Sequence, residues 1–254
     1  MKVSIFITCI VDQMFPRVGV AMAEVLGRLG VDVAFNPEQT CCGQPAFNTG
    51  FREEARTVAL HMIDVLEKEL QSADYIVAPS GSCTTMVKQF YTELFEAGDE
   101  ALARLGGITP RMYEFSQFLV NVLGVDNVGA VYRGTVTYHD SCHLLRELGV
   151  SSEPRKLIRA VHGAELIEMD HADACCGFGG TFSVKYPEIS TAIDKEKLAS
   201  IQRCGATTVV GCDSSCLMQI AGLASRQHLP VKFMHIAELL ASREPVDGDA
   251  EGAG

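Results

Sequence analysis

The 254-residue chain lacks features that would place it in several common classes of protein. No apolar run is long enough to cross a bilayer, so no membrane-spanning helix is expected. Positive charge is scarce: 21 Lys and Arg stand against 32 Asp and Glu, which gives a net charge of −11. A chain this acidic repels phosphate backbones, so nucleic acid is not an expected partner.

The opening segment MKVSIFITCIV also lacks the small-residue cleavage site of a signal peptide, and Asp12 ends its apolar run. We therefore predict a buried first strand here and a cytoplasmic location. In that compartment, ten cysteines indicate metal or redox chemistry rather than a disulfide framework.

Eight of the ten cysteines form two matched sets. We call them the first quartet, which is Cys9, Cys41, Cys42 and Cys83, and the second quartet, which is Cys142, Cys175, Cys176 and Cys216. The offsets between matching cysteines are 133, 134, 134 and 133 residues. Such constant spacing indicates a tandem duplication. It divides the chain into halves at 1–125 and 126–244, followed by an acidic, Gly-rich tail at 245–254 that we expect to be flexible.

Each cysteine position follows a short β-branched apolar run, such as VSIFIT before Cys9 and DYIVAPSGS before Cys83. Helical patterns separate these runs. The alternation predicts an α/β fold of two tandem-duplicated Rossmann-like halves, each a parallel sheet flanked by helices. Because parallel strands end at one edge, the cysteines of each quartet should converge at the carboxyl edge of their sheet.

Four convergent thiolates suit zinc or an iron–sulfur cluster. Structural zinc sites usually draw ligands from tight C-x₂₋₄-C pairs, whereas these ligands come from three loops with a vicinal pair in the middle. That arrangement favours a cluster and leaves zinc as the alternative. A metal-free thiol–disulfide protein is a further alternative. Cys204 lies outside both quartets and is predicted to be a buried free thiol.

The motifs CCGQPAFNTG, PSGSC, CCGFGGTFSVK and SCLM resemble the family of cysteine-rich CCG domains, and the likeness spans nearly the whole chain. That family includes the CCG-bearing subunit of heterodisulfide reductase and the iron–sulfur subunits of glycolate oxidase and of lactate-utilisation systems. This sequence most resembles the last two. The resemblance implies an electron-transfer subunit with [4Fe–4S] clusters, non-cubane in one family relative. It also implies other lactate-utilisation subunits as partners, one of them a ferredoxin-type iron–sulfur protein, in the oxidation of L-lactate to pyruvate.

This sequence departs from the fullest family pattern, which has five cysteines in each half. The second half offers Cys212 as a fifth candidate ligand. The first half has Pro79, Ser80 and Ser82 where a partner for Cys83 would lie. The resemblance therefore implies four candidate ligands in the first half and five in the second.

Two histidines flank Cys142 in the stretch YHDSCHL, and the first half has none at the matching place. We predict His139 and His143 as catalytic residues, acting as a proton donor or a substrate contact beside the cluster. A hydrogen-bonded structural role is the alternative. The asymmetry indicates that the second half carries the chemistry. His235 is predicted to cap or pack at the start of the last helix.

Overall fold

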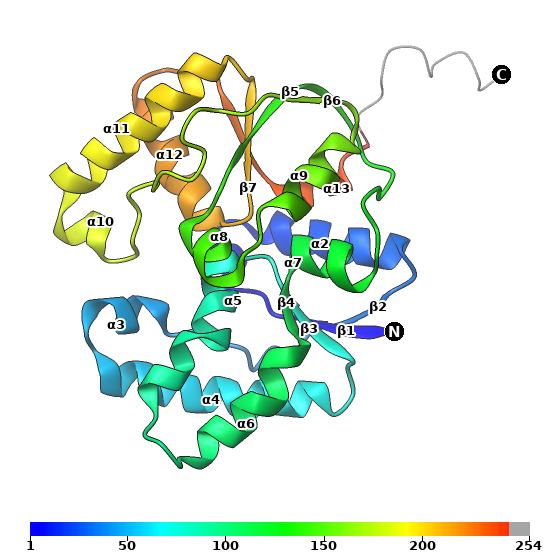
Figure 1. Ribbon diagram of the computed structural model, residues 1–254, viewed down its shortest axis with the longest axis vertical. Coiled ribbons are helices and arrows are strands. Elements are labelled where there is room, and N and C mark those ends of the chain that lie inside the picture. The colour runs from blue at the N-terminus through cyan, green and yellow to red at the C-terminus, as the bar shows by residue number, and fades with distance from the viewer. Residues whose placement is uncertain (244–254) are drawn as a thin grey trace.

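A computed structural model describes residues 1–243, so the predicted tail at 245–254 lies outside the described residues. Within the described part, the strands form two separate four-stranded sheets with every pair parallel, in the orders β2-β1-β3-β4 and β6-β5-β7-β8. Helices flank both sheets (Figure 1). The predicted fold of two α/β halves with parallel sheets is confirmed.

The first sheet has the strands β1 (Lys2–Ile5), β2 (Asp32–Ala34), β3 (Tyr75–Ala78) and β4 (Met112–Glu114). Its helices are α1 (Cys9–Met14), α2 (Pro16–Arg28), α3 (Gln44–Thr49), α4 (Arg52–Leu70), α5 (Gly81–Lys88), α6 (Glu100–Ile108) and α7 (Phe115–Gln117). Three short helical segments complete this half: η1 (Phe90–Leu94), η2 (Thr109–Arg111) and η3 (Phe118–Val122).

The second sheet has the strands β5 (Val131–His139), β6 (His162–Leu166), β7 (Thr208–Gly211) and β8 (Lys232–His235). Its helices are α8 (Cys142–Leu148), α9 (Ser152–Arg159), α10 (Phe182–Lys185), α11 (Pro187–Cys204), α12 (Ser214–Arg226) and α13 (Ile236–Ala241). The division predicted between residues 125 and 126 falls between η3 and β5 and stays a prediction.

The strand register repeats between the sheets. Val3 pairs with Tyr75 in the first sheet, and Val136 pairs with Thr208 in the second. Both partners are shifted by 133 residues, the same offset that relates the cysteines. Residues at this offset therefore occupy equivalent places, and the residue equivalent to His139 at the end of β5 is Phe6, just after β1.

The two halves pack against each other through helices that the sequence assigns to different halves. α2 begins at Pro16, where the missing N–H of proline costs no helical hydrogen bond, and it buries an apolar face that includes Met22 and Leu26. This face shares one hydrophobic core with Leu239 and Leu240 of α13. Figure 1 shows α2 lying between the two halves, and it packs against α13.

A second contact joins α5 to α8 at the centre of the molecule (Figure 1). A Cβ atom on Gly81 would lie 2.5 Å from Cβ of Leu144, which is closer than such atoms approach. Glycine therefore permits the first turn of α5 to lie directly against α8. Since Cys83 is on α5 and Cys142 begins α8, this contact brings the two quartets towards each other.

Candidate functional site

Each quartet gathers where its strands end. Cys9 and Cys142 are the first residues of the helices that follow β1 and β5. Cys83 lies in the first turn of α5 after β3, and Cys216 in the first turn of α12 after β7. The vicinal pairs come from the loops after β2 and β6.

The sulfur atoms of the first quartet interact in sequence. The Sγ atoms of Cys9 and Cys41 are 3.6 Å apart, and Cys42 contacts both Cys41 and Cys83. The second quartet repeats the chain of contacts, from Cys142 to Cys175, then to Cys176 and Cys216. The predicted convergence within each half is therefore found.

Both quartets line the same cavity. Its volume is about 840 Å³, including space that opens to solvent, and all eight cysteines contribute to its wall. Cys42, Cys176 and Cys216 are buried, whereas Cys175 is exposed. The cavity therefore presents two thiol-rich walls, one from each half, to one shared space.

The Cys-Cys-Gly triplet has the same geometry in both halves. Gly43 and Gly177 have φ angles of +84° and +85°, in the left-handed region that favours glycine. Each glycine N–H donates a hydrogen bond to the sulfur two residues before it, at 3.4 Å to Cys41 Sγ and 3.3 Å to Cys175 Sγ. The glycine turns the backbone so that an N–H points at the first sulfur of the pair.

Hydrogen bonds from neighbouring thiols favour the thiolate at one position of each pair. Hydrogen bonds from Cys42 and Cys9 lower the pKa of Cys41 to about 3, and those from Cys142 and Cys176 lower the pKa of Cys175 to about 2. The same contacts raise the pKa of the donating thiols. Because thiolates are the metal-binding form, each quartet holds one ligand ready, and a bound cation would favour loss of the other protons.

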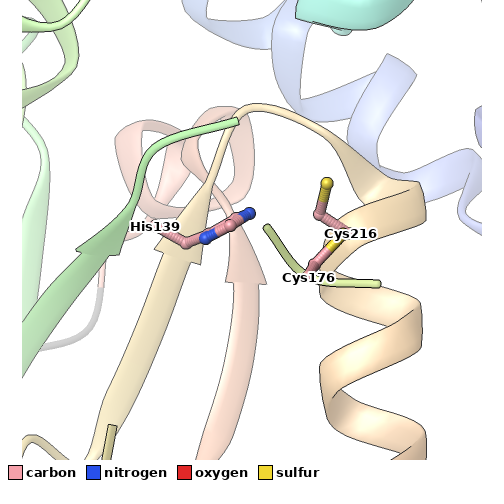
Figure 2. A group of neighbouring side chains, drawn as sticks. All are labelled: His139, Cys176 and Cys216. Carbon is pink, nitrogen blue, oxygen red and sulfur yellow. The ribbon is translucent and has the colours of Figure 1, made fainter. Parts of the chain in front are cut away.

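His139 faces the second quartet from the end of β5 (Figure 2). A ring nitrogen of His139 and the Sγ atoms of Cys176 and Cys216 all lie within 4.8 Å of one another. The side chain is 1% exposed, and neither ring nitrogen has a hydrogen-bond partner among residues 1–243. Burial lowers the pKa of His139 to about 3, so the ring is neutral and can offer a nitrogen lone pair.

His143 is placed differently. It lines the cavity, is half-buried, and its Nδ1 lies 3.9 Å from Cys142 Sγ. Its ring also meets Phe90 edge to face at 5.8 Å between centroids. His143 can therefore contact a molecule in the cavity, whereas buried His139 can reach only the sulfur atoms and groups around them. Their predicted catalytic roles stay predictions.

Cys212 points into the core at the end of β7. It is fully buried, and its Sγ lies 3.3 Å from Tyr138 Oη and 3.9 Å from Ser116 Oγ. It belongs to the shared hydrophobic core. The structure thus separates Cys212 from the eight sulfurs that line the cavity. Cys204 is half-buried at the end of α11, where its thiol donates to the carbonyl of Ile201.

Asp213 is an important residue that sequence reasoning did not single out. It is 1% exposed, and it accepts hydrogen bonds from Ser80 Oγ at 2.7 Å and from Ser82 Oγ at 2.8 Å, and one from Ser141 Oγ. Two of these donors belong to the first half and one to the second. A single carboxylate therefore fixes the loops beside both quartets. The aligned repeats give one signal for it, since an acid stands at Asp213 where the first half has Ser80.

His235 begins the last helix as predicted. Its Nδ1 accepts from the N–H of Ala237, and Glu238 accepts a hydrogen bond from the N–H of His235. Its Nε2 also lies 3.1 Å from the carbonyl of Pro79 in the other half. The capping role is confirmed.

The fold and the site together define an α/β protein with two internally repeated, cysteine-lined walls around one cavity. The cysteine-rich CCG domain matches residues 3–88 and 136–221, once in each half. The chain belongs to this family. None of the helices in residues 1–243 combines the length and apolar character needed to cross a membrane.

Close relatives carry one name. "Lactate utilization protein A" from Geobacillus sp. (strain WCH70) is 46% identical over 96% of this chain and 100% of its own length. The protein of the same name from Bacillus velezensis (strain DSM 23117 / BGSC 10A6 / LMG 26770 / FZB42) is 47% identical over the same shares. Among solved structures, an aspartate racemase homologue from Pyrococcus horikoshii OT3 aligns over 94% of this chain and 95% of that chain at 10% identity, with a TM-score of 0.34. A similarity this low does not establish a shared fold or function.

Proposed function

We propose that this chain is an iron–sulfur electron-transfer subunit of a cytoplasmic complex that oxidises L-lactate. The observation that carries the proposal is the convergence of two cysteine quartets on one cavity. Its support also includes the CCG family and the full-length relatives named for lactate utilization. The other lactate-utilisation subunits, one of them a ferredoxin-type protein, are the proposed partners.

The donor set fits an iron–sulfur centre. Thiolate sulfur is the ligand that iron–sulfur clusters prefer, and each half offers four such groups from three separate loops. The first quartet would hold one centre and the second quartet the other. When bound, such a centre would supply reversible one-electron transfer.

The surrounding residues would tune and protect the bound group. The N–H groups of Gly43 and Gly177 already donate to cysteine sulfur, and such hydrogen bonds shift the potential of a cluster. Asp213 holds the serine-containing loops of both halves in place. Cys42 and Cys176 are buried, so their sulfur atoms are shielded from bulk water. His143 faces the cavity and can contact a substrate or partner group there.

A zinc-bearing scaffold subunit is the second candidate. The compact set of His139, Cys176 and Cys216 favours it, because three mixed nitrogen and sulfur donors at this spacing also suit a tetrahedral ion. The first quartet gives no equally compact set of Cys, His, Asp and Glu within residues 1–243. The zinc candidate therefore accounts for one quartet and leaves the matched other one unexplained.

Anaerobic purification separates the two candidates. We expect stoichiometric iron and acid-labile sulfide with broad visible absorption, and we expect Cys176→Ser to lose a large part of both. Cys204→Ser is the matched control, because Cys204 lies outside both quartets. Colourless protein that carries stoichiometric zinc under strict anaerobiosis would contradict the electron-transfer proposal.

A further inference from the structure

The buried surroundings of the two quartets differ at equivalent positions. The offset of 133 residues between the two sheets places Phe6 of the first half where the second half has His139. On the longest helix of each half, the offset of 134 residues places Ile63 of α4 where α11 has Lys197. All four side chains are at most 1% exposed, so they face the interior of their own half.

The same contrast continues around the sites. Asp194 of α11 stands where α4 has Leu60, and Gln219 of α12 stands where α5 has Met86. Most of the polar groups around the second quartet have hydrogen-bond partners. Lys197 Nζ donates to the carbonyls of His171 and Ala172, and Gln219 Nε2 lies 3.4 Å from Asp194 Oδ2.

His139 differs from them, because both of its ring nitrogens are buried without a hydrogen-bond partner among residues 1–243, whereas Asp194 leaves only its Oδ1 unpaired. Buried polar atoms of side chains are nearly always paired in proteins, so a doubly unpaired imidazole indicates a ligand. The ring extends towards Cys176 and Cys216 (Figure 2), and its nitrogen lies within 4.8 Å of both sulfurs. A metal atom bound between these three donors would complete the coordination that the protein alone leaves open.

We propose that His139 supplies an imidazole nitrogen ligand to a metal atom that it shares with Cys176 and Cys216, so that the two halves hold unequal centres. The first centre is bound by thiolates alone, because Phe6 offers no donor at the equivalent place. The inference rests on the proposed function, which supplies the metal centre. The ligand role replaces the predicted role of His139 as a substrate contact, because the buried ring is not accessible to a substrate.

The test is nitrogen spectroscopy on iron-loaded protein. The chain is expressed with ¹⁵N-histidine or with natural histidine, loaded with iron and sulfide anaerobically, and reduced. We expect pulsed EPR to show a strongly coupled nitrogen that changes from the ¹⁴N to the ¹⁵N pattern with the label. ⁵⁷Fe Mössbauer spectra should also show one iron site with a distinct isomer shift, whatever the spin state of the centre.

Matched variants assign the nitrogen. His139→Phe, which installs the residue of the first half, should abolish the strong coupling and the distinct iron site. His143→Ala removes the nearest other histidine, whose Nδ1 lies 3.9 Å from Cys142 Sγ, and should retain both signals. If His139→Phe fails to fold, the labelled wild-type protein still decides whether a histidine binds iron, and His143→Ala decides whether that histidine is His143.

Three results overturn the assignment. They are iron-loaded wild-type protein with no strongly coupled histidine nitrogen, weak coupling typical of an N–H···S hydrogen bond, and strong coupling that disappears in His143→Ala. In each of these cases the iron and sulfide content still supports the proposed function. Protein that takes up no iron or sulfide contradicts the proposed function itself, and the assignment with it.

Discussion

Ser80 donates a hydrogen bond of 2.7 Å to Asp213, although the two residues occupy the same place in the two repeated halves. The contact therefore crosses between equivalent loops, each of which leads into a helix that carries a quartet cysteine. A duplicated fold would put one cysteine site on each sheet. This contact, with the close approach of α5 to α8, puts both sites on one cavity.

Removing the Asp213 carboxylate should destabilise the whole chain. Asp213→Ala leaves Ser80, Ser82 and Ser141 without their shared acceptor, and buried hydrogen bonds to a charged group contribute about 1.5–3 kcal/mol each. We expect a loss of about 3 kcal/mol or more in the free energy of unfolding, measured with urea. Asp170→Asn is the control, because the Asp170 carboxylate is 76% exposed and forms only a 3.9 Å ion pair with Arg203. Equal effects of the two substitutions would contradict the role given to Asp213.

The α5–α8 contact depends on glycine. In Gly81→Ala the new Cβ lies 2.5 Å from Cβ of Leu144, which the backbone fixes in place, so the two helices must separate. We expect a loss of about 1–3 kcal/mol in unfolding free energy, the usual cost of overpacking. Gly222→Ala in α12 meets nothing within 4 Å and should be neutral or stabilising. Adding Leu144→Gly removes the Cβ that causes the clash, so Gly81→Ala should cost less in that background than in the wild-type chain, and an equal cost would show that the contact is not the cause.

The glycine of the second Cys-Cys-Gly triplet should be required for metal loading. Gly177→Ala combines a φ of +85° with a Cβ only 2.5 Å from the carbonyl oxygen of Ser190, so the loop must shift. We expect about half of the bound iron to be lost, with the first quartet unaffected. Gly205→Ala, at φ +71° but with open space around the Cβ, costs only the left-handed conformation and should keep its iron. The measurement is iron per chain after anaerobic loading.

Glu114 should make the stability depend on pH. Burial raises its pKa from 4.5 to about 7, even though the N–H groups of Ser116 and Gln117 donate to the carboxylate. The folded state therefore binds a proton that the unfolded state has released, and stability falls as pH rises between these two values. The loss amounts to about 3 kcal/mol, at 1.36 kcal/mol per pKa unit. Glu114→Gln should remove this part of the slope in urea unfolding across that pH range, and an unchanged slope would contradict it.

Cys212 tests the ligand count that the family resemblance implies. The structure places its sulfur against Tyr138 and Ser116 in the core, apart from the cavity. We therefore expect Cys212→Ala to keep its iron content and visible spectrum, with a modest loss of stability from the cavity it creates. Cys216→Ala is the matched comparison and should lose iron. Loss of iron in Cys212→Ala as well would restore the five-cysteine set for the second half.

The sequence predicts the fold and the grouping of cysteines well, because the signals for both lie along the chain itself. Buried strands, helical periods and the 133-residue offset are all visible along the chain, and parallel strand ends bring Cys142 and Cys216 together without further information. The face-to-face arrangement of the two quartets depends instead on packing between the halves. Neither the contact of Gly81 with Leu144 nor the hydrogen bonds to Asp213 have a periodic signal.

The orientation of single side chains is also hidden from sequence spacing. The family pattern makes Cys212 a candidate ligand, but its position at the end of β7 turns its sulfur towards Tyr138. Spacing also treats His139 and His143 alike, whereas β5 buries the first and α8 presents the second to the cavity. These outcomes depend on which face of an element meets the core, and a one-residue difference in sequence reverses it.

Anomalous diffraction from anaerobically grown crystals tests the central claim most directly. With data on both sides of the iron edge, we predict iron density at each of the two quartets, bonded to Cys42 in one and to Cys176 in the other. Peaks that appear only at the zinc edge, or sulfur atoms joined in disulfides with no metal between them, would contradict it.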